Sequence, residues 1–119
     1  GGEHAPIGAA LAADGIDELL HIYTRRYGGQ RLSRRLVLRC TDRPEAWRIT
    51  PATIGGDATR VVVDRCAGTT AADVEAPAAS LLLAMSHRLT PDEAVLGWPS
   101  GDPDAETAAR TFLAGPLTA

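Results

Sequence analysis

The sequence has 119 residues, of which 45% are hydrophobic and 23% are charged, and its formal net charge is −3. This length suits one domain and leaves no room for a second independent core. The apolar fraction excludes general disorder, and the longest apolar run, Leu81–Met85, is far below the ~20 residues that a membrane span needs. The first residues lack the pattern of a secretory signal, so we expect none. We therefore expect a cytoplasmic, single-domain protein that has no membrane partner.

The first part of the chain combines a tail and a helix. Residues 1–13 are rich in Gly, Ala and Pro, and we interpret them as a linker or tail. Asp14 is a suitable N-cap for a helix that runs to about Tyr27, because apolar residues recur on one face, and Gly28-Gly29 would end it. The sequence therefore predicts one folded domain over residues 14–119.

The middle of the chain changes to an alternating pattern that is typical of strands. Turn signals such as Asp42-Arg43-Pro44 separate the segments. Four short strands are predicted, at residues 34–41, 46–50, 60–65 and 71–75. Because these strands follow one another closely, an antiparallel meander is the simplest arrangement.

The helical period returns after the strands. We predict a helix over Pro77–Leu89, a fifth strand over 94–98, and a last helix that Asp102 caps and Pro103 opens. The predicted fold class is therefore α+β: a small mixed or antiparallel sheet of about five strands with helices packed on it.

Residues that could carry chemistry are few. Glu18 and His21 form a single Glu-x-x-His pair, a spacing that di-iron bundles use twice, so we predict no metal site. Cys40 and Cys66 have no neighbouring histidine that could act as a base, and we interpret them as small buried residues. No nucleophile motif or phosphate-binding loop is present. We therefore assign no catalytic residue on these grounds.

A cluster of arginines precedes and enters the first predicted strand. Our first interpretation is that these arginines are solvated and protect a sheet edge from aggregation. Our second is that they form a contact surface for an acidic partner domain. The chain is acidic overall and has no stacking-sheet signature, so we expect no nucleic-acid partner. The members of the cluster are Arg25, Arg26, Arg31, Arg34, Arg35 and Arg39.

Four stretches of the sequence together resemble one family. They read ALAADGIDELL at 10–20, TDRPEAWRI at 41–49, DVEAPAASLLLAMSHR at 73–88 and GDP at 101–103. In their order and spacing they are similar to the C-terminal domain of the mycothiol-dependent maleylpyruvate isomerase family, over about Ala10–Leu113. This resemblance implies a fold like that of sterol carrier proteins.

The resemblance also implies a partner. Members of the family place a DinB-like four-helix bundle before such a domain, and the bundle holds a divalent metal and is where the cofactor mycothiol reacts. The resemblance therefore implies a non-catalytic accessory domain that docks on a metal-binding bundle, in cis or in trans, and holds no cofactor itself. We do not expect this chain to be active alone.

The resemblance points to one residue, Arg88. In the family, the long apolar helix commonly ends in Trp-Gly-Arg, and the corresponding residues here are Ser86-His87-Arg88. The family's C-terminal domain presents a basic residue toward the metal site, so Arg88 is the candidate contribution to a site on the partner domain. Arginine binds carboxylates through two parallel hydrogen bonds. A capping role at the helix C-terminus is the alternative that we rank first for the isolated chain.

A stand-alone carrier for a small apolar ligand is the rival hypothesis. Its predicted ligand-binding residues are Trp47, Leu81, Leu82, Met85 and Trp98. We favour the interpretation that these side chains simply form the core, because a large empty pocket would be costly in so short a chain. A regulatory interaction module is a third class, with no distinctive mark in the sequence.

Overall fold

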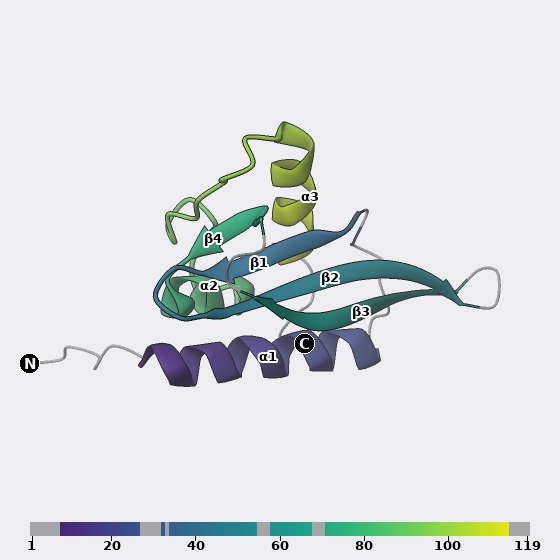
Figure 1. The fold of residues 1–119 in the computed structure, drawn as a ribbon, viewed down its shortest axis with the longest axis horizontal. Coiled ribbons are helices and arrows are strands. Elements are labelled where there is room, and N and C mark those ends of the chain that lie inside the picture. Colours follow the sequence, from purple (N-terminus) through teal and green to yellow (C-terminus); the bar gives the residue numbers. More distant parts are fainter. Residues whose placement is uncertain (1–7, 27–31, 33, 55–57, 68–70, 115–119) are drawn as a thin grey trace, which may run out of the picture.

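The computed structural model describes residues 8–26, 32, 34–54, 58–67 and 71–114 (Figure 1). The elements in chain order are α1 (Ala9–Arg26), β1 (Leu36–Cys40), β2 (Glu45–Ile54), β3 (Ala58–Ala67), β4 (Val74–Ala76), α2 (Ala78–Met85) and α3 (Pro103–Leu113). The α+β class predicted from the sequence is confirmed, with three helices packed on one small sheet.

The sheet has four strands in the order β3-β2-β1-β4. The pairs β1–β2 and β2–β3 are antiparallel, whereas β4 runs parallel to β1. The predicted mixed sheet is therefore confirmed, and the simple antiparallel meander is wrong at its last strand. The reason is topological: after β3 the chain passes to the far side of β1, so β4 pairs with a strand that is not its neighbour in sequence.

The predicted fifth strand over 94–98 is replaced by a turn and an isolated bridge. Gly97 forms one antiparallel bridge with Glu75, through backbone hydrogen bonds of 2.7 and 3.0 Å. Val95 has a φ of 54°, in the left-handed region, and its side chain is 79% exposed. This backbone conformation is incompatible with an extended strand, which is why the pairing is confined to a single residue.

The core lies between the sheet and its helices. Alternate strand residues face the same side, and the apolar ones are buried against α1 and α2. These fully buried residues are Leu36, Leu38, Trp47 and Ile49 from the sheet, Ile16 and Leu20 from α1, and Leu81 and Met85 from α2. The other face of the sheet carries charged pairs: the register places Arg39 beside Glu75 and Arg48 beside Asp64.

The helix boundaries correct the sequence analysis at two points. α1 begins at Ala9, before the expected N-cap Asp14, because the alanine-rich segment is a strong helix former. Ala12 and Ala13 are buried, so residues 9–13 belong to the domain and the predicted boundary at residue 14 is wrong. The predicted end of this helix at Tyr27 and the tail residues 1–7 lie outside the described residues.

The second correction concerns α2, which ends at Met85 instead of Leu89. The chain leaves the helix because His87 takes a φ of 60°, in the left-handed region that ends helices. α3, in contrast, has the predicted start: Asp102 accepts a hydrogen bond of 2.9 Å from the Asp104 N–H, and Pro103 occupies the first turn.

Candidate functional site

An open groove runs between α1 and the end of α2. It has a volume of about 520 Å³. Its lining is mostly apolar, with one acidic and one basic side chain, and consists of Gly15, Glu18, Leu19, Ile22, Leu82, Leu83, Ser86 and Arg88. The groove exists because two helices of different length pack side by side, so that α1 continues past the point where α2 ends.

Close packing of the two helices sets the floor of the groove. A Cβ atom built on Gly15 would lie 3.1 Å from Leu82 Cδ2, which is tighter than ordinary van der Waals contact. Glycine at this position therefore lets the α1 backbone approach α2 closely. As a result, Leu82 is held against α1 and remains only partly buried at the groove.

Arg88 lies just beyond α2, where the chain has turned away from the helix axis. Its backbone N–H donates to Leu83 O at 2.9 Å. The preceding residues anchor the turn, because the Ser86 hydroxyl donates to Leu82 O at 2.9 Å and a His87 ring nitrogen lies 2.9 Å from Leu113 O. Arg88 lines the groove at α1 and also a second groove of about 300 Å³ beside Leu89 and Leu113.

The Arg88 guanidinium differs from most arginines in the described part of the chain. Most of them form ion pairs with carboxylates, namely Arg34, Arg39, Arg43, Arg48, Arg65 and Arg110. Arg88 is exposed and has no carboxylate partner among the described residues, nor does its side chain donate to a helix carbonyl there. Backbone and Ser86 donors already occupy the last carbonyls of α2. Among the described residues, the Arg88 side chain therefore does not cap α2 through a hydrogen bond to these carbonyls.

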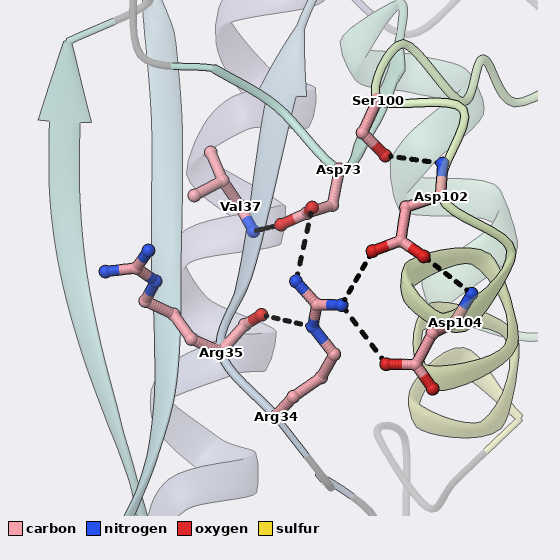
Figure 2. Close-up of polar contacts among 7 residues, drawn as sticks. All are labelled: Arg34, Arg35, Val37, Asp73, Ser100, Asp102 and Asp104. Atoms are coloured by element: carbon pink, nitrogen blue, oxygen red, sulfur yellow. Dashed lines mark hydrogen bonds and ion pairs between the residues drawn. The ribbon is translucent and has the colours of Figure 1, made fainter.

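Some arginines of the cluster predicted from the sequence form ion pairs with carboxylates of the same chain. Figure 2 shows Arg34 between Asp73 and the two aspartates at the start of α3. Its Nη1 lies 3.1 Å from Asp102 and 3.2 Å from Asp104. The hydrogen bond from the Asp104 N–H and the nearby Arg34 guanidinium hold the pKa of Asp102 below its ordinary value. Arg34 therefore ties β1 to α3 instead of presenting a free charge.

The five residues predicted to line an internal ligand site lie partly in the core and partly at the surface. Trp47, Leu81 and Met85 are fully buried and pack in the core. Leu82 lies in the groove, and Trp98 lies apart from it, with the Arg110 guanidinium 5.1 Å from the centre of its ring. Neither of the two grooves described above is therefore lined by all five side chains.

The possible metal ligands are also separated. The His21 Nδ1 lies 2.7 Å from the Asp17 backbone oxygen and 3.7 Å from its carboxylate, whereas Glu18 lines the groove. Among the described residues, no group of three or more His, Cys, Asp or Glu side chains could hold a metal ion. Sequence reasoning missed the carboxylate of Asp17, which also accepts a hydrogen bond of 3.1 Å from the Trp47 indole N–H.

The two free cysteines differ in environment. Burial, together with the nearby Asp42 and Glu45 carboxylates, raises the pKa of the Cys40 thiol to about 11. Only on the order of one Cys40 thiol in a thousand is then ionised at about pH 8. We expect iodoacetamide at that pH to alkylate the half-buried Cys66 and to spare Cys40, as measured by mass spectrometry of peptides. Both should react in urea, and equal rates in the folded protein would contradict this prediction.

Comparisons of the chain with protein-family models, with curated proteins and with solved structures found no match. Among the helices of the described ranges, none has both the length and the apolar character needed to cross a membrane.

Proposed function

We propose that this chain is a cytoplasmic, non-catalytic accessory domain that docks on a metal-binding four-helix bundle and presents Arg88 to a site on that bundle. The observation that carries the proposal is the exposed guanidinium of Arg88 at the rim of two grooves, without a carboxylate partner in the described ranges. The resemblance to the C-terminal domain of mycothiol-dependent maleylpyruvate isomerases supports the same residue. Mycothiol and the divalent metal would be held by the bundle.

The chemistry of the groove supports this role. Leu19, Ile22 and Leu82 provide apolar surface that a partner helix could cover, and Arg88 stands beside it as a cation. Covering the groove would remove water from the guanidinium and strengthen its attraction for an anion. A substrate carboxylate could then be held by two parallel hydrogen bonds, which fix its orientation as well as its position.

The test is the substitution Arg88→Ala, measured in the complex with a metal-loaded bundle of such an isomerase. We expect thiol-dependent isomerisation of maleylpyruvate to fall by at least about tenfold, because a carboxylate clamp contributes to substrate orientation. The free energy of unfolding of the domain should change by less than about 0.5 kcal/mol, since Arg88 is exposed and has no ion pair with the described residues. Enzyme kinetics and urea unfolding measure the two effects separately.

A matched control is available in Arg35→Ala. Arg35 is exposed too and has no carboxylate partner in the described ranges, but it precedes β1 and does not line the grooves. This variant should keep full activity. Equal losses in the two variants would contradict a specific role for Arg88. Stoichiometric metal binding or turnover by the 119-residue chain alone would overturn the accessory role itself.

The carrier hypothesis has less support. Three of its five predicted lining residues, Trp47, Leu81 and Met85, fill the core. A small apolar ligand would instead have to lie in the open groove, where water reaches it. Native mass spectrometry of the purified chain tests this directly, because a carrier should retain lipid at a fixed stoichiometry.

A further inference from the structure

Two opposite charges line the groove between α1 and the end of α2 without forming an ion pair with each other. Glu18 lies on α1, and Arg88 lies just beyond α2. Both side chains are exposed, and neither forms an ion pair with any residue in the described ranges. The groove therefore has an unpaired carboxylate on its α1 side and an unpaired guanidinium on its α2 side.

The surface between these two charges is apolar. Ser80 is the only polar residue among the 8 residues of α2, and a helix that is apolar on all sides is normally buried on all sides. Leu82 and Leu83 of α2 are instead only partly buried, and they line the groove together with Leu19 and Ile22 of α1. An apolar surface that is bordered by charges in this way is typical of a contact with another protein surface.

A second copy of the same groove offers the complementary charges. When two identical surfaces meet face to face, the two-fold axis that relates them lies in the plane of the interface. If this axis runs midway between Glu18 and Arg88, at right angles to the line that joins them, Glu18 of each copy lies opposite Arg88 of the other. The apolar residues between the charges then face their own copies. A single symmetric contact therefore pairs both charges and covers the apolar surface.

The shape of the groove suits this contact. α1 has 18 residues and α2 has 8, so α1 continues as a ridge past the point where α2 ends (Figure 1). The axis described above exchanges the two sides of the groove, because it places Glu18 of one copy over Arg88 of the other. The α1 ridge of each copy thus lies over the end of α2 in the other copy, where Leu19 and Ile22 can enter the hollow of about 520 Å³.

We propose that two copies of this chain form a dimer through this groove, with Glu18 of each copy paired to Arg88 of the other. The dimer covers the guanidinium that the proposed function presents to the bundle, and its regulatory consequence rests on that function. Because Arg88 cannot face a second copy and the bundle at the same time, docking on the bundle requires the dimer to dissociate. Self-association therefore keeps Arg88 covered until a bundle is present.

Charge reversal tests the pairing. Glu18→Arg places arginine opposite Arg88 twice in each dimer, and Arg88→Glu places glutamate opposite Glu18 twice. For each single variant we expect the dissociation constant of the dimer to rise by at least about tenfold, because like charges that face each other oppose association. When the two variants are mixed, both contacts pair an arginine of one chain with a glutamate of the other, so the dimer should return. Sedimentation equilibrium of the purified chain over the micromolar to millimolar range measures each case.

Arg35→Glu is the matched control, because it makes the same change of charge at an exposed arginine that lines neither groove. This variant should dimerise like the wild type. Circular dichroism shows whether each variant is folded, and if one charge reversal prevented folding, the other would test the same pair. A monomeric wild-type chain, or dimers that neither reversal weakens, would overturn the proposal. So would single variants that stay monomeric when they are mixed.

The regulatory consequence is tested with the metal-loaded bundle of a mycothiol-dependent maleylpyruvate isomerase. Adding this bundle to the dimer should give a complex that contains one copy of the chain, as measured by sedimentation velocity. A bundle that bound the intact dimer would show that Arg88 is not covered there, and would overturn the proposal. If the bundle did not bind at all, the proposed function would fail, whereas the charge reversals would still decide whether the dimer forms through the groove.

Discussion

Replacement of Trp47 by alanine is expected to lower the free energy of unfolding by about 3–5 kcal/mol. The side chain is fully buried and is the largest in the core. Its indole N–H donates to Asp17 Oδ1 at 3.1 Å, and the Arg65 guanidinium lies 5.9 Å from the ring centre, so the indole connects β2 to both α1 and β3. Urea unfolding followed by circular dichroism measures the loss.

Two further variants separate the causes. Trp47→Phe keeps most of the apolar volume and removes the N–H donor, so its loss should be about 1–2 kcal/mol. Trp98→Ala removes a half-buried tryptophan outside the core and should cost less than Trp47→Ala. If Trp47→Ala left stability unchanged but released a bound apolar ligand, Trp47 would line a pocket and the carrier hypothesis would replace the core interpretation.

The features that sequence predicted well are local ones. The change of period from helical to alternating located all four strands, because burial on one face of a sheet imposes that pattern. The start of α3 was also predictable, since Asp102 and Pro103 act on the turn that immediately follows them. Each of these signals depends on residues that are close in the chain.

The features that sequence could not predict depend on residues far apart. The Ala78 N–H at the start of α2 donates to the Asp42 carboxylate, 2.9 Å away but 36 positions earlier. Likewise, the parallel pairing of β4 with β1 joins segments separated by two other strands. Such contacts follow from the topology, which no local pattern in this sequence specifies.

The candidate site shows the same division. Arg88 could be named from the family resemblance, but its lack of an ion pair with the described residues depends on where carboxylates lie in space. The sequence alone does not distinguish Arg34 from Arg88. In the structure, however, the carboxylates of Asp102 and Asp104 contact Arg34, although they lie 68 and 70 positions away in the chain. The groove was not predictable either, because it depends on the unexpectedly early end of α2 at Met85.

Asp73 is the residue for which we expect the second large effect. One of its carboxylate oxygens accepts a hydrogen bond of 2.8 Å from the Val37 N–H (Figure 2). Its own N–H donates to Val37 O at 2.9 Å. These two bonds continue the pairing of β1 and β4 just before β4 begins, and one of them uses the Asp73 side chain. In Asp73→Ala the N–H of the buried Val37 loses its acceptor, and the free energy of unfolding should fall by about 2 kcal/mol.

Asp73→Asn distinguishes the hydrogen bond from the charge. The asparagine oxygen can still accept from Val37, but the side chain no longer attracts Arg34, whose Nη2 lies 3.9 Å away. Because that ion pair is long and Arg34 is partly exposed, its loss should cost much less than the loss of the hydrogen bond. In urea unfolding, the wild type and Asp73→Asn should therefore have similar free energies of unfolding, and that of Asp73→Ala should be well below both. If the asparagine variant were as unstable as the alanine variant, the charge on Asp73 and its attraction for Arg34 would hold β1 and β4 together, and the hydrogen bond to Val37 would be secondary.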